Sequence, residues 1–218
     1  TGGLFANGDF QIVDKTASDG FNPRVLGAYK VSETLTWNAQ VAQGFRLGGV
    51  NDPLNAGLCT DGDRATFGGF QSYDDETMWN YETGFKADWD NGVKLNVAIF
   101  RAEIEDLQVT LDAGSCSSRI SFNVEEAHTV GFEFELTAEP SDGLILSLAG
   151  SMLESEFDDT VLSDTGGILG GIEKGNRLAS VPELQFATSA TYNFATDLFG
   201  GSEGYFSATV QYVGDRFT

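Results

Sequence analysis

The chain contains few of the residues that build catalytic or metal centres. Its 218 residues include two cysteines and one histidine. A zinc site needs several Cys, His or acidic ligands together, and a hydrolytic triad needs a histidine beside a nucleophile. His128 stands alone, so the sequence predicts no catalytic residue, no metal centre and no cofactor.

Basic residues are few, and long apolar runs are absent. Twelve Lys and Arg stand against 33 Asp and Glu, and the net charge is −21. Nothing in such a chain neutralises phosphate, which argues against nucleic-acid partners. No run of about 18 apolar residues is present, so no transmembrane helix is predicted. Frequent glycine and the absence of helical apolar spacing make helices a minor element.

One stretch, residues 78–89, alternates strictly between apolar and polar side chains. Its apolar face consists of Trp79, Tyr81, Thr83, Phe85, Ala87 and Trp89. Such alternation predicts a strand with one apolar face. Ten strand residues tilted by about 40° span roughly 25 Å, which is the height of the apolar band of an outer-membrane barrel. A tryptophan at each end fits the aromatic girdles of that band.

Similar alternation predicts about eight strands. The other stretches are residues 22–31, 35–46, 93–111, 120–138, 144–152, 184–194 and 206–212, with the end of a preceding strand in 4–13. The phase blurs at Phe100-Arg101, where we expect a bulge. Within 120–138, only Val130–Ala138 is continuously apolar, so we place it in lipid and Ile120–His128 above it.

The predicted connections alternate in length. Short ones fall at 32–34, 90–92, 140–143 and 195–204, and longer ones at 47–77, 112–118 and 158–177. Short periplasmic turns and longer extracellular loops are typical of outer-membrane barrels. The fold class is therefore all-β: an antiparallel up-and-down transmembrane β-barrel segment. Trp37, Phe85, Phe132, Phe134, Phe186 and Val210 are expected to point outward, with Asn38, Glu82, Glu133, Gln185 and Gln211 on the opposite face.

Five motifs, in order, resemble the barrel of TonB-dependent outer-membrane receptors. They are Gly44-Phe45-Arg46 with Asn51; Glu76-Thr77 with Asn80-Tyr81-Glu82, Gly84 and Lys86; Asn123, Ala127, Gly131 and Glu133; Val181-Pro182-Glu183; and Tyr212-Val213-Gly214-Asp215-Arg216. The resemblance implies that 1–218 is part of one barrel domain. It also implies that the plug domain and the final strands lie outside this sequence, as Thr1-Gly2-Gly3, which looks like a chain interior, suggests.

The resemblance implies a receptor in the outer membrane of a Gram-negative bacterium that uses energy passed through TonB. The solute class would be an iron-siderophore, cobalamin or a glycan, captured at extracellular loops. The implied partners are this solute, the lipid bilayer, the plug domain and, through the missing plug region, TonB. The alternatives are a passive porin-like channel and a secreted β-sandwich binding or adhesion module.

Several residues are candidates for the site. In the long loop, Arg64, Phe67, Phe70 and Tyr73 are predicted solute contacts, with loop packing as the alternative. Arg46, Glu82, Lys86 and Glu133 are predicted to face the lumen, the two basic ones pairing with Glu82 or Asp88. The cysteines, Cys59 and Cys116, fall in loops placed outside the cell, so a disulfide is predicted, with two separate thiols as the alternative. The acidic groups at 61–63 and 74–76 are solvated loop residues or, alternatively, calcium ligands.

Overall fold

The structure, a computed structural model, describes residues 17–163, 166–196 and 200–217. The strands are β1 (Arg24–Lys30), β2 (Leu35–Arg46), β3 (Gly49–Val50), β4 (Ser72–Tyr73), β5 (Glu76–Trp89), β6 (Val93–Asp112), β7 (Arg119–Ser141), β8 (Leu144–Phe157), β9 (Leu184–Thr196) and β10 (Ser202–Val213). The helical segments are α1 (Asp61–Phe67) and the 3-10 turn η1 (Gly114–Cys116). The strand predicted within 4–13 lies outside the described residues.

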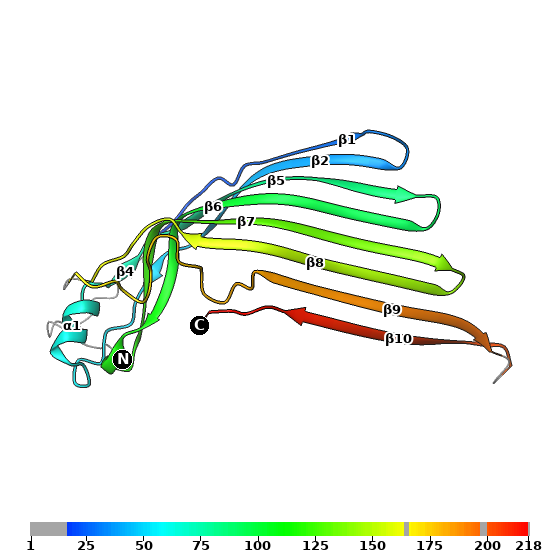
Figure 1. The fold of residues 1–218 in the computed structure, drawn as a ribbon. Coiled ribbons are helices and arrows are strands. Elements are labelled where there is room, and N and C mark those ends of the chain that lie inside the picture. Colours follow the sequence, from blue (N-terminus) through cyan, green and yellow to red (C-terminus); the bar gives the residue numbers. More distant parts are fainter. Residues whose placement is uncertain (1–16, 164–165, 197–199, 218) are drawn as a thin grey trace.

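Eight strands form one curved, open antiparallel sheet (Figure 1). They follow the order β1-β2-β5-β6-β7-β8-β9-β10, so each long strand pairs with its neighbours in sequence, and β3 pairs with β4 in a separate ribbon. The short turns lie at one end of the sheet, and the longer connections gather at the other. This up-and-down arrangement confirms the predicted fold class; the sheet does not close on itself.

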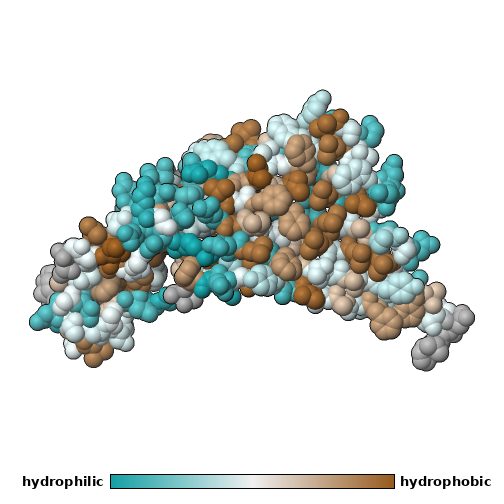
Figure 2. Space-filling view, viewed as in Figure 1, coloured by the Kyte–Doolittle hydropathy of each residue, from teal (hydrophilic) through white to brown (hydrophobic). Residues whose placement is uncertain are grey.

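The strand register gathers the apolar residues on one face. Trp37 pairs with Phe85, Phe85 with Val97, Val97 with Phe134, and the row continues through Gly150 to Phe186. Residues directly opposite each other in a ladder project to the same side. Figure 2 shows apolar side chains gathered over the middle of the strands, with hydrophilic ones toward the long-loop end. We call this apolar face the belt.

The opposite face of the sheet is polar and hollow. Its hollow of about 620 Å³ is lined by residues that include Asn38, Glu82, Glu133, Gln185 and Gln211. These are the side chains that the alternation predicted for the inner side. We call this face the wall.

Two irregularities interrupt the ladders, and neither lies at Phe100-Arg101. The β6–β7 register runs without a break from Val93 to Glu105, so the predicted bulge there is wrong. Asp106 instead adopts a positive φ of 55° and drops out of the ladder, and the β7–β8 register shifts between Ala138 and Ser141. Phe100 blurred the sequence phase because this large apolar side chain has the parity of the wall, where its ring packs against Gly131.

The β6–β7 hairpin extends beyond the belt and carries a small domain of loops, which we call the cap. The connections 47–75, 113–118 and 158–183 lie at this end of the sheet (Figure 1). The seven-residue helix α1 was not predicted. Thr60 caps its N-terminus, since its side chain accepts a hydrogen bond from the Asp63 backbone N–H, and the helix ends at the buried Phe67. No helix among the described residues is fit to span a bilayer.

Candidate functional site

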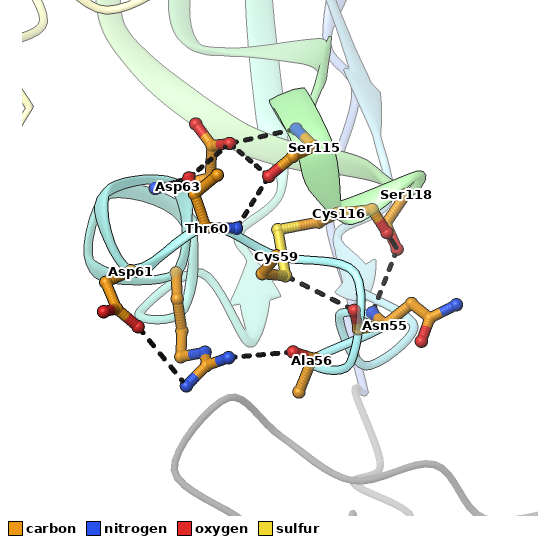
Figure 3. Close-up of a disulfide and its surroundings, with 10 residues drawn as sticks. Asn55, Ala56, Cys59, Thr60, Asp61, Asp63, Ser115, Cys116 and Ser118 are labelled. Carbon is orange, nitrogen blue, oxygen red and sulfur yellow. Dashed lines mark hydrogen bonds and ion pairs between the residues drawn. A yellow bond between two sulfur atoms is a disulfide. The ribbon is translucent and has the colours of Figure 1, made fainter.

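A disulfide and several hydrogen bonds join η1 to the loop that contains α1 (Figure 3). Cys59 and Cys116 are bonded, with their Cα atoms 4.1 Å apart, which confirms the predicted pairing. Beside them, the Thr60 backbone N–H donates to Ser115 Oγ at 2.7 Å. The Ser115 backbone N–H donates to Asp63 Oδ2 at 3.0 Å. We call these five residues the cap clamp.

The cap clamp keeps Asp63 in its carboxylate form. The pKa of Asp63 lies below its ordinary value because the hydroxyl and backbone N–H of Ser115 donate to it, and the Thr60 hydroxyl also donates. A carboxyl group with a lowered pKa stabilises the fold at pH values above its ordinary pKa of 3.8. This stabilisation is lost as the pH falls through the lowered pKa. The clamp is therefore complete at neutral pH.

Beneath the clamp lies an apolar core that the sequence analysis missed. Ile120, Phe122 and Val124 of β7 are at most 3% exposed, although this part of the strand was expected to stand free above the membrane. Phe67 and Phe157 join the same buried cluster. Burial of this kind stabilises each large side chain by about 1.5–3 kcal/mol. The loops of the cap therefore fold as a packed unit.

A polar knot ties β2, β5 and β6 together where they leave the belt. Arg46 Nη2 contacts the Glu76 carboxylate and donates to the Gln108 carbonyl at 3.0 Å. The Gln108 backbone N–H donates to Glu76 Oε2 at 2.7 Å. Arg46 thus pairs with Glu76, and its predicted pairing with Glu82 or Asp88 is wrong, because Glu76 lies directly opposite it in the ladder.

Two asparagines fasten the long loop to β7. The side chain of Asn123 accepts from the Asp74 backbone N–H at 2.7 Å and donates to the carbonyls of Asp74 and Asp106. The side chain of Asn51 accepts from the Ser121 backbone N–H at 2.8 Å and donates to the Ser121 carbonyl at 2.6 Å. Both asparagines belong to the motifs noted in the sequence, so these motifs hold the cap on the sheet.

The four predicted solute contacts are placed differently from one another. Phe67 is 9% exposed, and the Phe70 ring packs against that of Phe122 with centroids 5.0 Å apart. Arg64 donates to the Ala56 carbonyl at 2.8 Å. Tyr73 lies against Gly49, where its ring leaves no room for a Cβ atom. Both phenylalanines thus take part in packing inside the cap, and solute contact stays a prediction for all four residues.

Glu82, Lys86 and Glu133 line the same hollow of the wall, and their position in a barrel lumen stays a prediction. Glu82 accepts from Gln40 Nε2 at 2.8 Å. Asp88, a predicted partner of Lys86, pairs with Lys94 at 3.2 Å instead. The hollow therefore offers charged groups of both signs to whatever fills it.

Three of the acidic loop residues make internal contacts. Asp63 belongs to the cap clamp, Glu76 to the knot, and Asp75 accepts from the Gly48 backbone N–H at 2.6 Å. His128 Nδ1 lies 2.6 Å from Asp158, so it is not the water-exposed residue that the strand pattern suggested. No group of three or more metal-binding side chains occurs in the part of the chain that the structure describes.

Asp106 sits where β6 leaves its ladder, in an acidic setting. Its pKa is raised, first because of desolvation and then because Asp74 and Glu105 repel its charge. A raised pKa means that the charged carboxylate destabilises the folded state. Protonation of Asp106 therefore makes the protein more stable as the pH falls through the raised pKa toward the ordinary pKa of 3.8.

We expect Asp106→Asn to stabilise the protein at pH 7 by less than about 1 kcal/mol, since solvent screens the exposed carboxyl. Asparagine also tolerates the positive φ. Thermal unfolding of the full-length protein at pH 7 and pH 4 checks this, with the gain shrinking at pH 4. Asp112→Asn, at the end of the same strand, is the control. A loss of stability in Asp106→Asn would show that the carboxylate makes a favourable contact.

The comparisons with known proteins agree with this geometry. A family described as "TonB dependent receptor-like, beta-barrel" matches residues 3–218. The chain belongs to the TonB-dependent receptor β-barrel family. Its curated relatives include the probable TonB-dependent siderophore receptor PiuA of Acinetobacter baumannii, 30% identical over 143 residues, or 64% of this chain and 19% of that protein. The chain thus spans about a fifth of this relative.

Solved structures share the fold. The ferric yersiniabactin uptake receptor FyuA of Yersinia pestis superposes with a TM-score of 0.58 at 19% identity, covering 86% of this chain and 28% of that one. The FrpB iron transporter of Neisseria meningitidis gives 0.52 at 21% identity, covering 86% and 27%. Members of this receptor family are outer-membrane transport proteins, and the belt and wall are the two faces of such a barrel.

Two family-motif glycines have clear packing reasons. A Cβ atom at Gly84 would collide with the Val97 carbonyl oxygen, and one at Gly131 would collide with the Phe100 ring. The sequence analysis missed the role of Gln108 in the knot, because this residue belongs to no motif. It also missed the role of Ser115 in the cap clamp, because this residue lies in a loop. The residues of the cap core were visible as apolar alternation continuing above the belt at 107–111 and 120–124.

Proposed function

We propose that this chain is part of the barrel wall of a receptor in the outer membrane of a Gram-negative bacterium, which imports a scarce solute with energy transmitted through TonB. The observation that carries the proposal is one sheet with three surfaces. It has an apolar belt on one face, a polar wall on the other, and a packed cap at the long-loop end.

Each surface has a place in this proposal. The belt faces lipid, with Trp79 and Trp89 near the membrane interfaces. The wall, with Glu82, Lys86 and Glu133, faces the plug domain of the same receptor. The cap lies outside the cell and takes part in solute capture. An iron-siderophore is the favoured solute class, because the relatives are named for siderophore and iron uptake.

Uptake by cells that carry the full-length gene tests this proposal. In an iron-starved strain, we expect radioactive iron to enter from at least one ferric siderophore when the gene and TonB are both present. Deleting TonB should reduce this uptake to background, while a receptor missing its plug should leak solutes without TonB. The control is cobalamin and oligosaccharide uptake in the same strains.

Uptake that persists without TonB would instead indicate a passive porin-like channel. Recovery of the full-length protein in the soluble fraction without detergent would indicate a secreted binding module. Uptake of cobalamin or a glycan in place of iron would keep the transport mechanism and change the solute class.

A further inference from the structure

The wall has two chemically different halves. On β5, β6 and β7, the ladder register places Glu82, Lys86 and Glu133 on the wall, with Glu135 beside them. In the described strands β8, β9 and β10, the only charged residue with the wall's alternation is Glu203, near the start of β10. The middle of these three strands instead presents small neutral side chains, which are Ser147, Ala149, Ser151, Ala187, Ser189 and Thr209. We call these six residues the neutral track.

The charged half offers partners for charge-assisted hydrogen bonds. Arg24 Nη2 donates to Gln40 Oε1 at 2.8 Å, and Gln40 Nε2 donates to Glu82 Oε2, also at 2.8 Å. Glu135 Oε2 accepts from Asn96 Nδ2 at 3.2 Å. An ionised carboxylate has about four acceptor sites, so these glutamates can accept further bonds from a segment packed against them. Bonds to an ionised partner are roughly twice as strong as bonds between neutral groups.

The neutral track offers only weaker bonds. Ser151 Oγ accepts from Gln185 Nε2 at 3.0 Å, and Ala149 and Ala187, which line the hollow with Ser151, add no polar partner. A hydroxyl is both donor and acceptor, so its bonds to neutral partners exchange for bonds to water at little net cost. A segment that packs here therefore separates from the wall more easily than one that packs over β5–β7.

We propose that the plug domain remains bound to the charged half while the solute crosses the barrel along the neutral track. A force transmitted through TonB breaks the weaker plug contacts first, and those lie over β8–β10. The hydroxyls then hydrate the opening and bond the hydroxyl, amide or carbonyl groups of a hydrophilic solute, whatever its net charge. This path rests on the proposed function, since it needs a plug inside the wall and energy from TonB.

Two alanines in the hollow make a matched pair of probes. Ala98 lies on β6, in the charged half, and Ala187 lies on β9, in the neutral track. Ala98→Cys and Ala187→Cys are made singly in the full-length receptor, in which the Cys59–Cys116 bond leaves no other thiol among the described residues. A small charged methanethiosulfonate is added to iron-starved cells, and the modified fraction of each cysteine is followed over time by mass spectrometry.

Iron(III) complexes of a trihydroxamate, a tricatecholate and citrate are supplied in turn, with and without TonB, and uptake of radioactive iron is recorded in the same cells. With an imported complex, we expect TonB to speed the reaction of Ala187→Cys about tenfold more than that of Ala98→Cys. This is the factor that separates breaking a neutral hydrogen bond from breaking one to a charged group. The attached group should then block uptake in Ala187→Cys alone.

Equal acceleration at both cysteines would show that the plug leaves the barrel as one body, and faster reaction at Ala98→Cys would place the path over the charged half. Either result, or TonB-dependent uptake with no acceleration at Ala187→Cys, would overturn the path along the neutral track and leave the proposed function intact. Iron uptake that does not require TonB, or no uptake at all, would contradict the proposed function instead, and the path with it.

Discussion

Replacing both cysteines by serine is expected to loosen the cap, where the disulfide joins the long loop to η1, without unfolding the barrel. The disulfide closes a loop with a sequence separation of 57 residues. The chain-entropy relation gives roughly 4 kcal/mol for a loop of this size. We therefore expect the free energy of cap opening to fall by about this amount in Cys59→Ser/Cys116→Ser.

Native-state hydrogen exchange on the full-length receptor measures this effect. Amides of 51–75 and 113–124 should exchange faster in the variant, while those of 81–89 keep their protection. Wild-type protein should give linked peptides of Cys59 and Cys116 without reductant, and reduction should reproduce the variant. Unchanged cap exchange would mean that the apolar core alone fixes the cap; equal loss in β5 would mean that the cap and barrel unfold together.

A charge in the middle of the belt should destabilise the membrane-inserted protein. Phe134 lies in the apolar row across β7 and stacks with Phe132, their ring centroids 5.9 Å apart. Arginine at the bilayer midplane costs about 2–4 kcal/mol, so Phe134→Arg should lose that much in reversible unfolding from bilayers. Glu133→Gln, one residue away on the wall, is the matched control and should change stability little, because a carboxylate in a wet lumen needs no partner.

The sequence predicted the sheet well because alternation depends on only two local facts. Each strand residue points to the opposite side from its neighbour, and the two sides of a barrel meet different media. Trp37, Phe85 and Phe134 therefore fell on one face in both the prediction and the structure. Glycines in turn sequences also predicted where two hairpins end. Gly92 and Gly143 have positive φ angles of 77° and 78°, which favour glycine.

The cap was harder to predict because its contacts join distant parts of the chain. Phe67 and Phe122 are 55 residues apart in sequence, and only the folded loop brings them into one core. The helix α1 is short, and its Thr60 cap resembles any polar loop residue in sequence. The sequence therefore offered Phe67 as a solute contact and gave no sign that its ring packs in the cap core.

The ion-pair partner of Arg46 in the knot was also hard to predict from the sequence. Several acidic residues on β5 share the face of Arg46, and alternation alone does not select one of them. The partner is decided by the ladder register, which places Glu76 opposite Arg46 and leaves Glu82 opposite Gln40. Register depends on both strands and their connection, and the 47–75 connection is too long to fix it from sequence.

The central claim is that β5 crosses a bilayer with its apolar face in lipid, and an arginine scan along that face tests it most directly. Trp79, Phe85 and Trp89 lie on one face of β5, at its two ends and its middle. In the full-length receptor unfolding from bilayers, we expect Phe85→Arg to lose about 2–4 kcal/mol and arginine at either tryptophan to lose about 0–1 kcal/mol. Equal losses at all three positions would indicate a closed protein core around β5 and would contradict the membrane-spanning barrel.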